Sequence, residues 1–227
     1  LRSISDAEKA SFLKKLAIPF AFAIALSAAA LLQGRLDITI ALFLAMVLSL
    51  SVIRTVLTRG TPLPIASAFS PTREKCLVTL VAVGMMWLPI VMIATPFLDF
   101  AAYTLPPAVP LVGAILAVLG LWLFYRSHVD LGPYWSPMLE IRDAHVLITD
   151  GVYRRVRHPM YTALFLITGA QASFLQNWLA GPAGIVAFLI LYLVRVGPEE
   201  EMMEETFGDD YRNYSERTGR LIPKITS

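Results

Sequence analysis

Residues 38–57 read ITIALFLAMVLSLSVIRTVL, an apolar run in which Arg54 is the only charged side chain. A helix needs about 17–25 such residues to cross the hydrocarbon core of a membrane. Five similar blocks occur along the chain, at Leu16–Leu32, Leu77–Phe97, Ala108–Phe124, Pro159–Leu175 and Trp178–Val194. Backbone groups in lipid must be hydrogen-bonded within the segment itself, and strand-like alternation is absent. The sequence therefore predicts an all-α integral membrane protein with about six transmembrane helices.

The overall composition agrees with a membrane protein. Of the 227 residues, 56% are hydrophobic and 16% are charged, and the mean hydropathy is +0.64. A soluble domain usually carries about 25% charged residues. One alternative stays open for the first block, which follows Lys14 and Lys15 and also has the pattern of a secretory signal peptide.

The positions of the basic residues predict an orientation. If the N-terminus is cytosolic and all six blocks span, all of the 19 Lys and Arg residues except Arg35 fall on the cytosolic side. Cytosolic loops are enriched in Lys and Arg. We therefore predict that both termini face the cytosol.

The blocks divide the chain into two parts. Residues 1–125 contain four predicted spans, and residues 126–227 contain a polar segment, two spans and a charged tail. The polar segment, residues 126–158, has short β-prone pieces with turn signals and predicts a small hairpin-like cytosolic cap. Only Gln176 and Asn177 separate the last two blocks, which predicts a tight helical hairpin, and the tail predicts helices that complete the cap.

Charge is concentrated at both cytosolic ends of this hairpin. Residues 151–165 read GVYRRVRHPMYTALF, and Arg195 at the end of the last block is followed one helical turn later by Glu199 and Glu200. A single arginine at a helix end is often only reaching for lipid phosphates. Two charged clusters at the ends of one hairpin indicate a shared polar pocket, and ionisable groups at this depth are functional candidates.

The same residues carry a family resemblance. The stretches GVYRRVRHPMY and RVGPEEEMMEETFGDDYRNYSERTGRLIP resemble the isoprenylcysteine carboxyl methyltransferase family over roughly residues 130–224. The family pattern is G-x-Y-x-x-x-R-H-P-x-Y, then an arginine, a Glu-Glu pair, Phe-Gly, two tyrosines and R-L-x-P. The resemblance implies methyl transfer from S-adenosylmethionine inside the membrane. The sequence has no G-x-G-x-x-G motif, so a soluble dinucleotide-type fold is not expected.

The resemblance also implies site residues. Arg195 and Glu200 match the positions near the reacting groups, and the predicted S-adenosylmethionine-binding residues are His145, Leu147, Tyr153, Arg157, His158, Pro159, Tyr161 and Glu199. We expect Arg195 to orient a substrate carboxylate, because its guanidinium forms a rigid fork that suits one. A carboxylate is already ionised at pH 7 and needs no general base. A thiol or amine acceptor would need one, and Glu200 would be the candidate.

The implied acceptor is an isoprenylcysteine or a similar lipophilic, prenylated carboxylate that enters from the lipid bilayer. Alternatives are a phospholipid N-methyltransferase, a small-thiol S-methyltransferase, an NADPH-dependent membrane sterol reductase and a non-catalytic scaffold. Cys76 is the only cysteine, so no internal disulfide, cysteine cluster or metal site is predicted. Nucleic-acid binding has no support, and the sequence indicates no oligomeric state. The expected location is the inner membrane of a prokaryote or the endoplasmic reticulum of a eukaryote, with the active site facing the cytosol.

Overall fold

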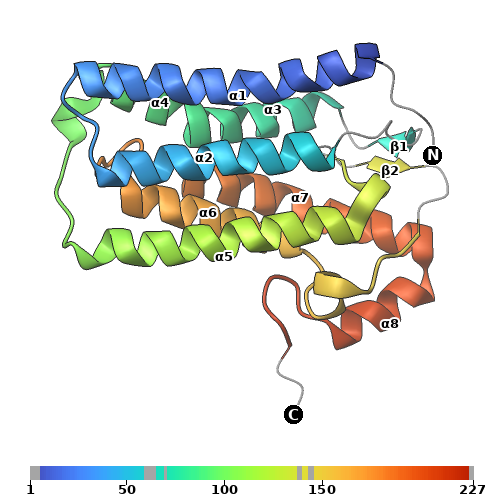
Figure 1. The fold of residues 1–227 in the computed structure, drawn as a ribbon. Helices are drawn as coiled ribbons and strands as arrows, with labels where there is room; N and C mark the ends of the chain where they lie inside the picture. The colour runs from blue at the N-terminus through green and yellow to red at the C-terminus, as the bar shows by residue number, and fades with distance from the viewer. Residues whose placement is uncertain (1–5, 59–64, 69–70, 137–139, 143–145, 225–227) are drawn as a thin grey trace.

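The computed structural model describes residues 6–58, 65–68, 71–136, 140–142 and 146–224. The fold is a bundle of long helices that run roughly along one direction, with smaller elements gathered at one end (Figure 1). The α-helices are α1 (Asp6–Leu32), α2 (Ile38–Leu57), α3 (Pro71–Ala82), α4 (Leu88–Ala94), α5 (Ala108–Leu131), α6 (Pro159–Phe174), α7 (Ala183–Phe207) and α8 (Asp209–Arg217).

Four helical stretches among the described residues are long and apolar enough to cross a membrane. They are Phe12–Leu32, Ile38–Leu57, Thr72–Ala94 and Ala108–Tyr134, and they correspond to the first four predicted blocks. The last two blocks also form helices, but α6 has 16 residues, or about 24 Å of a hydrocarbon core about 30 Å thick. The apolar part of α7 ends at Arg195. The protein is thus a helical protein with four candidate spans, and the count of six remains a prediction.

Helix α5 packs mainly against α6 along a line of small residues. A Cβ on Gly113 would lie 2.6 Å from the side chain of Ser173, and one on Gly120 would lie 2.8 Å from Ile167. Ala117, between these glycines, is buried. In lipid the hydrophobic effect does not drive helices together, so close backbone approach through small residues provides much of the packing energy.

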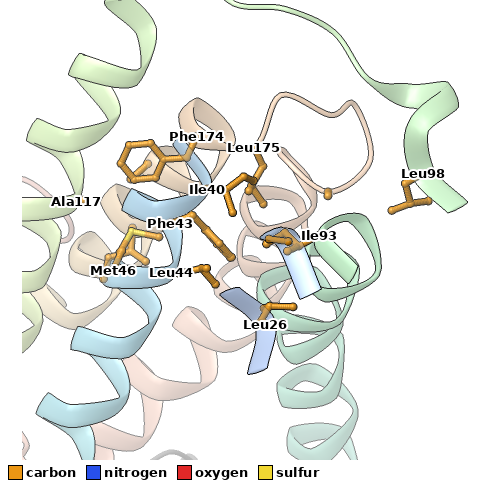
Figure 2. Packing of buried hydrophobic residues seen from close by; sticks show 14 of the residues in the cluster. Leu26, Ile40, Phe43, Leu44, Met46, Ile93, Leu98, Ala117, Phe174 and Leu175 are labelled. Carbon is orange, nitrogen blue, oxygen red and sulfur yellow. The ribbon is translucent and has the colours of Figure 1, made fainter. Parts of the chain in front are cut away.

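A small cluster of buried hydrophobic residues borders the charged end of the bundle and consists of Leu77, Tyr161, Phe188, Leu191 and Val196. A larger cluster forms the rest of the buried core. Its side chains come from α1, α2, α4, α5 and α6, and Figure 2 shows Phe43 and Met46 of α2 among residues of the neighbouring helices. Phe174 and Leu175 close the core at the end of α6 and are almost completely buried.

Pro89 alters the backbone hydrogen bonding of the third span, because proline has no N–H. The α-helical pattern gives way to a π-helical turn, η1 (Val83–Trp87), in which the N–H of Leu88 donates to the carbonyl of Val83. The next carbonyl, that of Gly84, would be reached by residue 89, but proline has no N–H. The side-chain amide of Gln171 in α6 donates to this carbonyl at 2.9 Å and also to that of Ala180 at 2.9 Å. A buried polar side chain thereby satisfies the free backbone group.

The connection between α6 and α7 is longer than the two residues that the sequence predicted. It covers residues 175–182, because the Asn177 carboxamide accepts hydrogen bonds from the N–H groups of Leu179 and Ala180 and donates to the carbonyl of Leu98 at 2.7 Å. Pro182 then precedes the first turn of α7. The helical hairpin is present, but its turn is anchored to the α4–α5 connection, which includes the 3₁₀ turn η2 (Pro96–Ala101).

The cap contains a small sheet that differs from the prediction. The polar segment does not fold as a hairpin on itself among the described residues. Its strand β2 (Glu140–Arg142) instead pairs antiparallel with β1 (Ile65–Ala68), which belongs to the connection between α2 and α3. The fold is therefore helical apart from this two-stranded sheet. Pairing across the chain joins two polar connections that leave the same end of the bundle (Figure 1).

The remaining cap elements follow the chain from α5 onward. Two short 3₁₀ turns, η3 (Gly132–Tyr134) and η4 (Gly151–Arg154), lie between α5 and α6. Helix α7 continues past Arg195 to Phe207, where Gly208 adopts a φ of +55° and starts α8. A left-handed glycine is a common end to a helix, and here it turns the chain back across the end of the bundle (Figure 1).

Candidate active site

A cavity of about 440 Å³ opens at the capped end of the bundle. This is within the usual size range for small-molecule sites, about 300–1,000 Å³. The ends of α2, α3, α5, α6 and α7 form its walls, with α8 and the segment before η4 beside them. Eight of the predicted site residues line it together: Leu147, Tyr153, Arg157, His158, Pro159, Tyr161, Arg195 and Glu199.

One predicted residue within the described part of the chain, Glu200, is not part of this lining. Glu200 lies behind the wall, where its carboxylate contacts the side chains of Arg157 and His158. His145 lies outside the described residues. The motif residues from the start of α6 and from α7 therefore meet in one cavity, as the hairpin interpretation required.

His158 is placed by the start of α6. It occupies the N-cap position and Pro159 the first helical position, where the missing N–H of proline has no consequence. The His158 side chain is 7% exposed, with Nε2 3.2 Å from Glu200 and Nδ1 3.7 Å from Glu199. Burial would lower the pKa of His158, but the two carboxylates outweigh it and hold this pKa above its usual 6.5. The ring is thus favoured as an imidazolium that donates to Glu200 through Nε2 and forms a longer ion pair with Glu199 through Nδ1.

Tyr161 and Glu199 form the next contact along the same wall. The Tyr161 hydroxyl donates a hydrogen bond to the Glu199 carboxylate, and the rings of His158 and Tyr161 stack with centroids 5.4 Å apart. Burial raises the pKa of Glu199, but the His158 and Arg195 cations and the Tyr161 hydroxyl lower it further than burial raises it. Glu199 is therefore a fixed carboxylate at the cavity surface.

Arg195 projects from α7 between two carboxylates. Its Nη1 lies 3.5 Å from Glu74 and its Nε lies 3.9 Å from Glu199. Glu74 is 2% exposed and belongs to the first turn of α3. Sequence reasoning missed Glu74. The only signal for Glu74 in the sequence is its position just before an apolar block. Its partner Arg195 lies on α7, far away along the chain, so the sequence does not indicate the pairing.

Glu200 joins three cations from separate segments. It accepts hydrogen bonds from Arg157 Nε at 3.0 Å, from His158 Nε2 at 3.2 Å and from Arg220 Nε at 3.2 Å. Burial alone would raise the pKa of Glu200, but His158, Arg220 and Arg157 bring it down to about 2. We call Glu200 and these three cations the Glu200 cluster.

The chain after α8 passes beside this cluster, where Gly219 forms an isolated parallel β-bridge with Val156. The N–H groups of Arg157 and His158 donate to the carbonyls of Gly219 and Arg220, at 2.8 and 3.0 Å, and the N–H of Gly219 donates back to Arg155. The Arg157 guanidinium also donates to the carbonyls of Ser215 and Thr218. Residues 220–223, the R-L-x-P part of the motif, therefore support the start of α6 and hold His158 in place.

Aromatic side chains cover the opposite part of the cavity. The Tyr214 hydroxyl donates to the carbonyl of Tyr153 at 2.6 Å, and burial raises the pKa of Tyr214 to about 12. The Tyr211 hydroxyl is buried at the cavity wall and has no hydrogen-bond partner among the described residues. Both tyrosines of α8, Tyr211 and Tyr214, therefore belong to the cavity lining.

Titration of His158 tests this arrangement without any substrate. A pKa raised on folding means that the proton is held more tightly in the native state. The resulting stabilisation is complete below pH 6.5 and is lost as pH rises through the folded value. We expect NMR of the protein labelled at its histidines to show a His158 imidazolium above pH 6.5. Glu200→Gln should lower that pKa, whereas a wild-type His158 that titrates at or below 6.5 would contradict the arrangement.

Known proteins are similar to this chain in the region that forms most of the cavity wall. The model of the isoprenylcysteine carboxyl methyltransferase (ICMT) family matches residues 112–205, which contain most of the cavity wall. A protein-S-isoprenylcysteine O-methyltransferase of Tribolium castaneum is 30% identical over 116 residues, covering 50% of this chain and 41% of the relative. A probable protein-S-isoprenylcysteine O-methyltransferase of Oryza sativa subsp. indica is 31% identical over 120 residues, covering 50% of this chain and 61% of the relative.

The matches thus span less than two thirds of these relatives' own lengths. The fold is similar to that of the eukaryotic intramembrane Ras methyltransferase ICMT, with a TM-score of 0.57 and 22% identity over 92% of this chain and 76% of the other. The chain is thus similar to the isoprenylcysteine carboxyl methyltransferase family over residues 112–205 and to these two relatives over half of its length, and it shares the fold of the solved ICMT structure.

Proposed function

We propose that this protein is an integral-membrane methyltransferase that uses S-adenosylmethionine to methylate a carboxylate on a lipophilic acceptor, most simply an isoprenylcysteine. The observation that carries the proposal is the single cavity in which His158, Tyr161, Arg195 and Glu199 meet. The names and activities of the relatives agree with this reaction.

The residues of the cavity fit the proposed methyl donor. S-adenosylmethionine has an ammonium and a sulfonium cation, a carboxylate and an adenosine. Glu199 offers a carboxylate for a cation, Arg157 and Arg195 offer cations for a carboxylate, and Tyr153 offers an aromatic ring. The buried Tyr211 hydroxyl, which has no partner among the described residues, would gain one from such a polar ligand. When bound, the donor supplies an electrophilic methyl group.

The state of Glu200 favours a carboxylate acceptor over a thiol or an amine. A thiol or ammonium acceptor must lose a proton, and Glu200 was the candidate base. Its pKa of about 2 and its hydrogen bonds from Arg157 and His158 make it a poor proton acceptor at neutral pH. A carboxylate needs no base, so the task of the protein is to align the reactants and exclude water.

We propose separate tasks for the predicted residues. Arg195 remains a predicted contact of the reacting groups. Its guanidinium lies between the carboxylates of Glu74 and Glu199. Glu200 acts through Arg157 and His158, as a positioning residue. Leu147 and, beyond the described residues, His145 remain proposed contacts of the adenosine.

The proposed setting places the cavity on the cytosolic side of the membrane. The site cations Arg54, Arg157, Arg195 and Arg220 lie at the capped end of the bundle, which the positive-inside rule assigns to the cytosol. In this proposal α6 and the apolar part of α7 complete six spans. Residues 126–227 form the catalytic region and residues 1–125 the preceding four spans.

Two measurements on the detergent-purified protein test the function. We expect S-adenosylmethionine to bind in calorimetry and NADPH not to bind, and we expect radiolabelled methyl transfer to a prenylcysteine to give a product whose label is released by base, as an ester requires. Glu199→Gln should weaken donor binding about tenfold, or about 1.4 kcal/mol, whereas the exposed neighbour Glu201→Gln should have no effect. NADPH binding or a base-stable product would overturn the proposal.

A further inference from the structure

Arg54 lies where two cavities meet. It lines the site cavity described above and also a second cavity of about 420 Å³. Ser51 and Met85 are the other residues that line both. Arg54 belongs to the last turn of α2, on the first half of the chain, outside the segment that the family model matches.

The second cavity has an almost wholly apolar wall. Apart from Ser51, Arg54 and Thr55, its lining consists of apolar side chains of α1, α2, η1 and α4: Ile18, Pro19, Phe22, Ala23, Leu26, Phe43, Leu44, Val47, Leu48, Met85, Met86 and Ile90. The two cavities thus differ in chemistry, one charged and aromatic and the other aliphatic, and the cation at their junction is Arg54.

The charge of Arg54 has no carboxylate partner among the described residues. Its guanidinium lies 5.5 Å from the centre of the Trp135 ring, an interaction with an aromatic face worth about 0.5–2 kcal/mol. The other arginines of the site cavity differ, because Arg157 is paired with Glu200 and Arg195 with Glu74 and Glu199. Arg54 is exposed in the last turn of α2 and lines both cavities, so its guanidinium is accessible to the carboxylate of a ligand that enters either one.

We propose that Arg54 binds the carboxylate of the acceptor at this junction and that the apolar chain of the acceptor lies in the second cavity. This inference rests on the proposed function. The sequence alone favoured Arg195 for this contact, but Arg195 has Glu74 and Glu199 beside it and is already proposed above as a contact of the donor carboxylate. Arg54 has no carboxylate partner among the described residues and adjoins the apolar cavity that an amphiphilic acid requires.

The same placement separates substrate from product. In the transfer a carboxylate oxygen forms a bond to the methyl carbon, the sulfur–methyl bond breaks, and its electron pair stays on sulfur. A sulfonium and a carboxylate become a neutral thioether and a neutral ester, and no proton is moved. The ester has lost the charge that held the acid to Arg54, so the methylated product binds more weakly than the acid and leaves.

The test compares the binding of a prenylcysteine with that of its carboxamide, which has the same chain and no charge. We expect the wild-type protein to prefer the acid by about 10–100-fold, the range for one charge-assisted hydrogen-bonded pair of about 1.5–3 kcal/mol. Arg54→Gln should reduce the preference to near one, and Arg54→Lys should restore part of it. The matched control is Arg154→Gln, an exposed cation of η4 outside both linings, which should keep the full preference.

Calorimetric binding of S-adenosylmethionine checks that each variant retains the site. If Arg54→Gln loses donor binding, the preference for the acid is measured instead with Arg54→Met, because a long apolar side chain suits the junction. Narrowing the second cavity by Val47→Phe should weaken a long prenyl acid more than a short one. A full preference for the acid in an Arg54 variant that binds the donor would overturn the inference, and so would equal effects of Val47→Phe on both chain lengths. Absence of methyl transfer by the wild-type protein would instead count against the proposed function, since the preference is measured without turnover.

Discussion

Glu200→Gln is expected to lower the free energy of unfolding by about 3 kcal/mol, because removing one partner of a buried ion pair leaves the other charge uncompensated. Arg157 and His158 are 12% and 7% exposed, so water cannot replace the lost carboxylate. Arg220 is 49% exposed and contributes little of this amount, since exposed ion pairs are worth about 0–1 kcal/mol. For a chain of this size the loss corresponds to a decrease of roughly 6–12 °C in the melting temperature.

The measurement is thermal unfolding in detergent micelles, followed by tryptophan fluorescence. The matched control is Glu201→Gln, which removes the same charge from the next residue of α7, where the side chain is exposed. We expect the control to melt within about 2 °C of the wild-type protein, as a surface change of under 0.5 kcal/mol implies. Equal melting temperatures for the two variants would show that the Glu200 cluster does not support the fold.

Gly219→Ala is expected to detach the chain after α8 from the start of α6. A Cβ at this position would collide with the carbonyl oxygen of Ile222 and would lie 2.9 Å from the backbone nitrogen of Lys224. Backbone atoms cannot rotate away as a side chain can, so residues 219–224 must move. The hydrogen bonds that Gly219 exchanges with Arg155 and Arg157 would be lost with that movement. Overpacking of this kind costs about 1–3 kcal/mol.

The effect should extend to the site, because His158 hydrogen-bonds to the same segment through its backbone N–H. We expect donor binding by Gly219→Ala to fall at least tenfold, together with faster proteolysis of the tail. The control is Gly197→Ala on the exposed part of α7, where a Cβ meets no atom within 4 Å. It should stabilise the helix by about 0.5–1 kcal/mol. Normal donor binding by Gly219→Ala would contradict the supporting role of the tail.

Most of the helical architecture was predictable because it depends on local pattern. The first four blocks became the four candidate spans, since length and hydropathy are properties of a segment by itself. Pro159 lies at the predicted start of α6, and Gly208 ends α7 with the positive φ that favours glycine. These residues act through their own backbone conformations, so their effect can be read without knowing the neighbours.

The pairing of distant segments was not predictable in the same way. The strand in the polar segment pairs with Ile65–Ala68 rather than with its sequence neighbours. The sequence of a short strand does not specify which other strand it pairs with, so this pairing could not be predicted. Glu74 and Arg54 carried no motif, and their importance comes from the elements that pack beside them. Helix α7 begins later than the predicted block. The Asn177 side chain holds the preceding turn against Leu98 of the α4–α5 connection, and Pro182 precedes the first turn of the helix.

The amino-acid sequence by itself determined the four candidate spans and carried the motif from which His158, Tyr161, Arg195 and Glu199 were predicted as site residues. Only the tertiary structure decided that these side chains share one cavity, that Glu200 is held behind its wall by three cations, and that Arg54 stands at the junction with an apolar cavity. The physical reason is that hydropathy and helix boundaries follow from neighbours along the chain. Ion pairing and cavity shape depend instead on distances between atoms that only packing brings together.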